Sequence, residues 1–228
     1  MSPVSCLLSP VSCLLSPASC LLQAHRTLYS QANMEARYFV KKKTLLALSK
    51  LTALASDLPE DKLNKQVDDI VEQERFLLHQ ETLPRQLLEE KQQNPDTMPL
   101  LSAHNLIQLY ICDDNRGANE YDYKKALDLL EYMDEEDAVD TDSLKCEIFG
   151  KALRRDDWSS ADGSDDPLEA AKDSIFVKIL LKLIQEGERL TDLIPSIICF
   201  YFIKLFTQLN ESDEEDRRFR GFKCFNPN

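Results

Sequence analysis

The chain has 228 residues, which is ample for one hydrophobic core and marginal for two. Its 5 glycines, 29% charged residues and 43% hydrophobic residues favour a helical globular protein. The formal net charge of −13 argues against general nucleic-acid binding, because contacts to phosphates need an excess of Lys and Arg.

The chain begins with a repeat. Residues 2–22 read Ser-Pro-Val-Ser-Cys-Leu-Leu twice and then Ser-Pro-Ala-Ser-Cys-Leu-Leu. A proline in every copy forbids one continuous helix, and the segment lacks the basic start and unbroken apolar run of a signal peptide. A metal-binding tract of three cysteines is the alternative. We expect residues 1–30 to be a low-complexity, disordered segment.

The helical domain is predicted over residues 31–190, and its first helix, ending at Asp57, has unusually much apolar surface. On a helical wheel, Leu46 and Ala53 form a small apolar face. The broader face is formed by Ala47, Leu48, Leu51, Leu54 and Ala55. The polar residues between the two faces are Lys43, Lys50 and Asp57. Because a surface helix needs only one apolar stripe, we expect this helix to be covered by its own domain and also by a partner.

Three helices follow this one. The second begins near Pro59 and stops before Pro84, and the third, Arg85–Gln93, ends at Asn94-Pro95. Ser102 is placed to cap the fourth.

Three more helices complete the predicted domain. Asn119 caps the fifth, and the sixth is Ser143–Arg155. The seventh has Asp166 as its N-cap and Pro167 at its first position, and it stops at Gly187. No strand-like alternation competes with these patterns. The expected fold class is therefore all-α, an irregular α-solenoid or helical stack of about seven to eight helices.

The residues after the domain have two different compositions. Residues 191–209 are predicted as an apolar helix that contains the run Leu193–Phe206. This run is shorter than the ~18–20 residues that a membrane crossing needs, which favours a buried or partner-facing helix over a tail anchor. Residues 210–228 are predicted as a charged, solvated tail.

Catalytic, cofactor and metal motifs are not found. The glycines form no nucleotide-binding pattern, and the three histidines lie far apart in the sequence. The seven cysteines contain no CxxC pair and are odd in number, which favours a reducing, intracellular compartment. We therefore predict no enzyme activity, no cofactor and no metal.

The loop Asp156–Glu169 is the nearest approach to a metal site. Gly163 and Glu169 occupy the glycine and last-ligand positions of a calcium loop, but Trp158 stands where the first carboxylate belongs. We interpret it as an acidic loop with Trp158 anchored on the helices. A calcium-responsive module or an enzyme that uses this loop is the alternative.

Several segments together resemble the C-terminal helical domain of the nucleoporin 133 family, scaffold components of the nuclear pore Y-complex. The resemblance covers about residues 32–195 and is collinear. The segments that carry it are Ala32–Leu51, Glu72–Pro84, Leu109–Cys112, Ala118–Tyr132, Ala152–Ser160 and Lys172–Leu180.

The resemblance implies a non-catalytic structural module that binds nucleoporin 107 in the outer rings of the pore. It implies a role in nucleocytoplasmic transport, including mRNA export and protein import, and a location at the nuclear envelope and the mitotic kinetochore. The family's contact helix matches the one that ends at Asp57. The residues at its partner-contact positions are Leu48, Lys50, Leu51 and Asp57. No homo-oligomer, transmembrane span or direct nucleic-acid contact is implied.

This chain departs from the family pattern at both ends. The family's N-terminal β-propeller is missing, the repeat stands where helices precede Ala32, and an Ile/Phe/Tyr-rich run follows Pro195. A truncated or alternative gene product, non-functional or regulatory, is therefore the alternative to a pore scaffold module. A tail-anchored helical protein is a further one.

Overall fold

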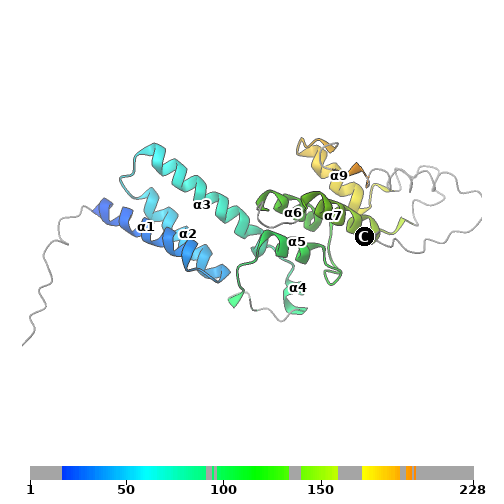
Figure 1. Cartoon of the computed structure of the whole chain (residues 1–228), viewed down its shortest axis with the longest axis horizontal. Helices are drawn as coiled ribbons and strands as arrows, with labels where there is room; N and C mark the ends of the chain where they lie inside the picture. Colours follow the sequence, from blue (N-terminus) through cyan, green and yellow to red (C-terminus); the bar gives the residue numbers. More distant parts are fainter. Residues whose placement is uncertain are drawn as a thin grey trace, which may run out of the picture. The chain divides into compact units, whose positions relative to one another are not determined.

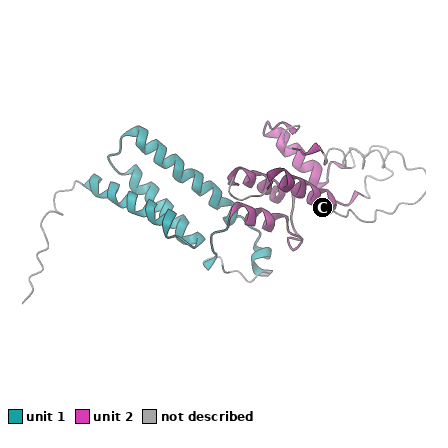
Figure 2. Cartoon of the chain, viewed as in Figure 1, with its two compact units in different colours: residues 1–101 teal, residues 102–228 magenta. Residues whose placement is uncertain are grey.

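The computed structural model describes residues 17–90, 94, 97–133, 140–158, 171–190, 194–196 and 198. It divides the chain into two compact units, residues 1–101 and residues 102–228 (Figure 2). The described residues contain α-helices, a short 3-10 helix and one isolated bridge between Tyr38 and Pro99, but no strand. The all-α prediction is confirmed.

The described part of unit 1 is built mainly from α-helices (Figure 1). Its elements are α1 (Pro17–Met34), α2 (Phe39–Leu54), α3 (Glu60–Glu81) and α4 (Arg85–Glu90). Helix α2 packs along α1 and also contacts α3. The core of unit 1 is formed by Ala32, Phe39, Leu46, Ile70 and Leu77, which come from all three of these helices.

Helix α1 corrects the prediction of disorder over residues 17–30. The helix begins at Pro17, the proline of the third repeat copy, and buries His25 and Ala32. Proline is tolerated in the first turn of a helix, where its missing N–H costs no hydrogen bond, and no proline follows until Pro59. The reasoning from proline spacing therefore fails after the last copy. Residues 1–16 lie outside the described part of the chain.

The first predicted helix is two helices in the structure. Residues 35–38 separate α1 from α2, and α2 ends at Leu54 rather than Asp57. The Ser56 hydroxyl donates to the Ala53 carbonyl over 2.7 Å, which satisfies a carbonyl at the end of the helix. Pro59 restricts the backbone of Leu58 before it, so that helix α3 starts afresh at Glu60.

The segment of residues 98–101 lies against α3 and the start of α2. The Phe39 N–H donates to the Met98 carbonyl, and the Leu100 N–H donates to the Arg37 carbonyl. The buried Gln80 side chain donates to the Pro99 carbonyl over 2.7 Å and accepts from the Leu101 N–H over 3.1 Å. These bonds fix the start of α2 within unit 1.

Unit 2 is built from α5 (Ala103–Ile111), α6 (Glu120–Asp128), the 3-10 helix η3 (Leu129–Tyr132), α7 (Thr141–Arg155) and α9 (Ile175–Gln185). The predicted caps Ser102 and Asn119 are confirmed, each accepting a backbone N–H of its helix. Helix α7 begins two residues before the predicted Ser143 because the Asp140 side chain caps it. Phe149 and Phe176 meet edge to face in this unit's interior, with ring centroids 6.0 Å apart.

Helix α9 is shorter than the predicted helix from Asp166 to Gly187. It starts at Ile175, where the Ser174 side chain accepts the Val177 N–H. The Asp156 carboxylate also accepts the N–H groups of Ile175 and Phe176, over 2.6 and 2.9 Å. The predicted stop is confirmed, with Gly187 at a φ of 83°. The predicted cap at Asp166 and most of the acidic loop lie outside the described residues.

The C-terminal predictions are largely outside the described part of the chain, which includes only 194–196 and 198 of the apolar run and nothing of the tail. Among the helices that are described, none combines the length and hydropathy needed to cross a membrane.

Candidate docking surface

Helix α2 has one buried face and one exposed apolar face. Leu46, Ser49 and Ala53 are inaccessible to solvent, and Phe39 joins them in the core. The exposed face is formed by Val40, Ala47, Leu48, Leu51 and Leu54, which we call the outer stripe. Leu48, Leu51 and Leu54 are 45%, 63% and 55% exposed. The prediction of two apolar faces on this helix is therefore confirmed, and the small face is the one that unit 1 covers.

A buried polar contact between α1 and α2 orients the stripe. The His25 side chain is 2% exposed, and its Nδ1 lies 2.9 Å from the Ser49 hydroxyl and 3.1 Å from the Ser49 carbonyl oxygen. Ser49 follows Leu48 directly, and side chains of neighbouring helix residues point about 100° apart. The contact that holds Ser49 inward therefore helps to keep Leu48 at the surface.

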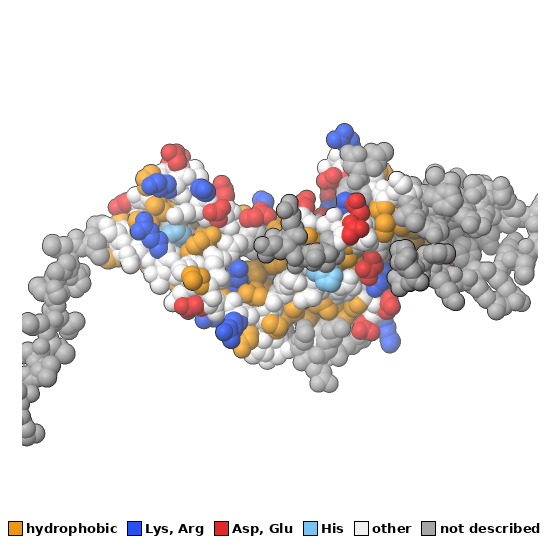
Figure 3. Space-filling view, viewed as in Figure 1, with side chains coloured by type: hydrophobic (Ala, Val, Ile, Leu, Met, Phe, Trp, Pro, Cys, Tyr) orange, Lys and Arg blue, Asp and Glu red, His pale blue; other side chains and the backbone are white. Residues whose placement is uncertain are grey.

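Ion pairs border the stripe on the side of α3. Lys50 Nζ lies 2.8 Å from the Glu74 carboxylate, with both side chains about a third exposed, and Lys43 pairs with Glu81. Burial lowers the pKa of the nearby Lys42 ammonium. On the face of unit 1 that Figure 3 shows, hydrophobic side chains reach the surface between such charged groups.

The structure places the four predicted contact residues differently. Leu48 and Leu51 lie on the outer stripe, as the wheel predicts. Lys50 is half-buried and tied to α3, and Asp57 is exposed in the link after α2, beyond the helical wheel. The prediction that Asp57 lies on the helix beside Lys50 is therefore wrong, because α2 ends at Leu54. Contact of Lys50 and Asp57 with a partner stays a prediction.

Val40 is the stripe residue that sequence reasoning missed. It is 40% exposed and lies seven residues before Ala47, which places it on the same side of the helix. This seven-residue spacing is the feature of the sequence that could have identified Val40. It was overlooked because the predicted helix had no boundary near Tyr38.

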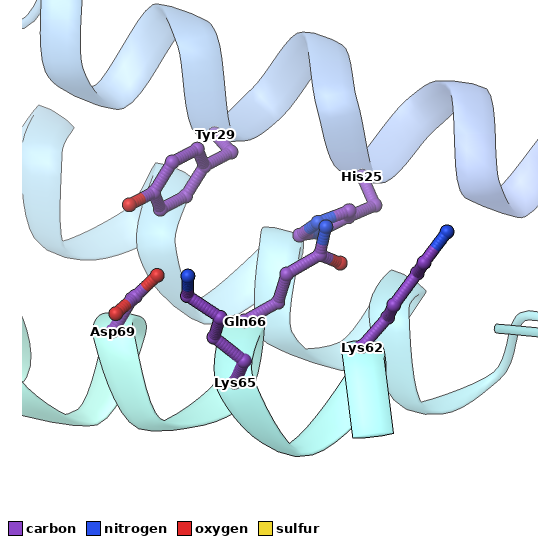
Figure 4. A pocket seen from close by; sticks show the side chains of 6 residues that line it. All are labelled: His25, Tyr29, Lys62, Lys65, Gln66 and Asp69. Atoms are coloured by element: carbon purple, nitrogen blue, oxygen red, sulfur yellow. The ribbon is translucent and has the colours of Figure 1, made fainter. Parts of the chain in front are cut away.

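Unit 1 also has a cavity of about 320 Å³ between α1 and α3 (Figure 4). It is lined by His25, Tyr29, Lys62, Lys65, Gln66 and Asp69. The side-chain oxygen of Gln66 is buried without a hydrogen-bond partner, while His25 is engaged by Ser49. The described residues contain no group of three or more His, Cys, Asp and Glu side chains that could hold a metal ion. The cavity offers polar groups but no metal-binding set.

No protein-family model matches the chain. It is 72% identical over 178 residues to the nuclear pore complex protein Nup133 of Danio rerio, and 63% identical over 175 residues to those of Mus musculus and Homo sapiens. Each match covers 77% of this chain.

Over the matched residues, the chain belongs to the nucleoporin 133 family. The sequence resemblance is confirmed, and it extends to a Drosophila melanogaster relative at 30% identity over 158 residues. The chain spans only 16% of the zebrafish protein and 15% of the mouse and human proteins. It therefore corresponds to a small part of a nucleoporin 133.

Proposed function

We propose that this chain is a non-catalytic scaffold module of the nuclear pore that docks to a neighbouring helical nucleoporin through the outer stripe of α2. The relatives are nuclear pore complex proteins by name. The observation that carries the proposal is the exposure of Leu48, Leu51 and Leu54 on one helix face. A contiguous apolar patch bordered by charged side chains is typical of a protein interaction site.

The proposed partner is the C-terminal helical domain of nucleoporin 107 in the Y-complex of the outer rings. The stripe fits such a partner because its apolar side chains recur at helical spacing, which suits the apolar face of another helix. Through this contact the chain would sit at the nuclear envelope and support mRNA export and protein import.

Leu51→Asp tests the proposal. Leu51 is the most exposed leucine of the stripe, so a carboxylate there leaves the folded unit intact but becomes buried and unpaired in the complex. We expect the dissociation constant for the nucleoporin 107 domain to rise at least ~30-fold, equivalent to a loss of about 2 kcal/mol or more. Titration calorimetry with the full chain measures this constant.

Leu78→Asp is the matched control. Leu78 is 54% exposed on α3, so the same change is made at a similar exposure but outside the stripe. We expect this variant to bind like the parent. Unchanged binding by Leu51→Asp, or an equal loss in both variants with retained helical circular dichroism, would reject the stripe as the docking surface.

The two charged positions are expected to act differently from the leucines. Lys50→Ala breaks the pair with Glu74 inside unit 1, and Asp57→Ala removes an exposed charge. Exposed charges contribute modestly, about 1 kcal/mol or less, and salt screens them. If Lys50 or Asp57 contributes charge to the contact, the association rate of its alanine variant should depend less on salt than that of the parent. The leucine variants should keep the salt dependence of the parent.

A further inference from the structure

Helix α9 in unit 2 also carries a second apolar face. Its inner face is buried and consists of Phe176, Ile179 and Leu183. Leu181 and Ile184 are 46% and 53% exposed, and Val177 is half-buried. These three residues are four and three positions apart, so they lie on one side of the helix. We call them the outer face of α9.

Helix α9 ends in a turn that changes the direction of the chain. Gly187 has a φ of 83°, its N–H donates to the Ile184 carbonyl, and the Glu188 N–H donates to the Leu183 carbonyl. This pair of bonds is the Schellman motif, which ends a helix and redirects the chain. The residues that follow Gly187 can therefore run antiparallel to α9.

The segment that follows the turn is apolar enough to cover the outer face of α9. Ile198 is 4% exposed, so one side chain of the apolar run is already inside the protein. Its N–H donates to the Pro195 carbonyl, and Ser196 and Ile198 are helical, as suits a helix with proline at its start. The run from Leu193 to Phe206 contains one charged residue, Lys204.

We propose that the segment Leu193–Phe206 docks on the outer face of α9 and completes the hydrophobic core of unit 2. The geometry permits it. The outer face spans about 10 Å from Val177 to Ile184, at 1.5 Å per helical residue, and a helical segment of this length spans about 20 Å. The five residues between Gly187 and Leu193 reach up to about 17 Å, which is enough for an antiparallel return.

Hydrogen exchange in the full chain tests the proposal. An isolated helix of this length is marginal in water, so its amides exchange slowly only if the segment is docked. We expect the amides of Leu193–Phe206 to exchange at least ~10-fold more slowly than in a free peptide of the same sequence. In Ile184→Glu we expect that protection to fall by at least ~10-fold, because the carboxylate lies under the docked segment.

Leu78→Glu is the control, since it replaces an apolar side chain of similar exposure in unit 1 with the same carboxylate and should leave the protection unchanged. Amides of α5 and α7, read in the same experiment, report whether unit 2 stays folded. If Ile184→Glu unfolds it, the milder Ile184→Ala should give a smaller loss in the same segment.

Three results would overturn the proposal. They are a segment that exchanges like the free peptide, equal protection in the parent and in a folded Ile184 variant, and a dimer in light scattering that Ile184→Glu dissociates. The last result would assign the outer face of α9 to a second copy of the chain.

Discussion

At the scale of residues, polar side chains fix where the helices begin and how they meet. Asn119 and Asp122 form a reciprocal capping box at the start of α6, and Asp140 caps α7. Each cap joins residues that are close in the sequence. The sequence therefore predicts the cap at Asn119 and places the start of α7 within two residues. The contact between His25 and Ser49 joins residues 24 positions apart, and no local pattern indicates it.

Asp140 gives a pH-dependent prediction. The hydrogen bonds from the Ser143 hydroxyl and the Asp142 N–H hold the pKa of the Asp140 carboxyl below its ordinary value. A lowered folded-state pKa adds stability that is present above the unfolded pKa, about 4, and is lost as the pH falls through the folded pKa. We therefore expect Asp140→Ala to melt at a lower temperature than the parent at pH 7.

The gap between these two melting temperatures should narrow as the pH falls below about 4. Asp140→Asn keeps an oxygen acceptor at the cap but does not titrate, so its own melting temperature should lie near the parent's at pH 7. Thermal melts of the three proteins from pH 3 to pH 7 measure this. A gap of constant size across the series would contradict the proposed role of the carboxylate.

At the scale of elements, α2 and α9 have the same pattern, since each helix is apolar on two sides. Each buries one side in its own unit and leaves leucine or isoleucine exposed on the other. For α2 the second cover is proposed to be another nucleoporin, and for α9 the chain's own following segment. A helix of this kind is more apolar than its unit requires, and that excess is visible in the sequence.

Two leucines of α2 separate its faces energetically. Leu46→Ala should lower the free energy of unfolding by about 2–5 kcal/mol, because Leu46 is fully buried and the change leaves a cavity. Leu48→Ala, two residues further on, should change it by no more than about 0.5 kcal/mol. Urea unfolding of both variants measures the difference, and equal losses would show that Leu48 is part of the core.

At the scale of the whole molecule, the chain has two compact units with separate sets of buried residues. Leu46, Ile70 and Leu77 belong to unit 1, and Phe149 and Phe176 belong to unit 2. A chain of 228 residues is expected to be marginal for two hydrophobic cores. The structure nevertheless divides it into two compact units. Damage to one core should therefore open that unit first.

Hydrogen exchange of core variants tests this independence. We expect Leu46→Ala to speed amide exchange in α1, α2 and α3 by at least ~10-fold and to change exchange in α5 and α7 by less than ~2-fold, since local unfolding follows the local core. Phe149→Ala should give the converse pattern. If either variant sped exchange equally in both units, the chain would unfold as one cooperative body.

The sequence by itself determined the all-helical class, the caps at Ser102 and Asn119, the stop at Gly187 and the two apolar faces of α2, because these depend on helical periodicity and on bonds between near neighbours. The predictions for α1, the end of α2 and the start of α9 were wrong. The position of a proline, or a side chain that is distant in the sequence, sets these boundaries. The tertiary structure alone decided which face of α2 is covered. Burial of Ser49 against His25, and of Leu46 in the core of unit 1, depends on residues that are brought together only by folding.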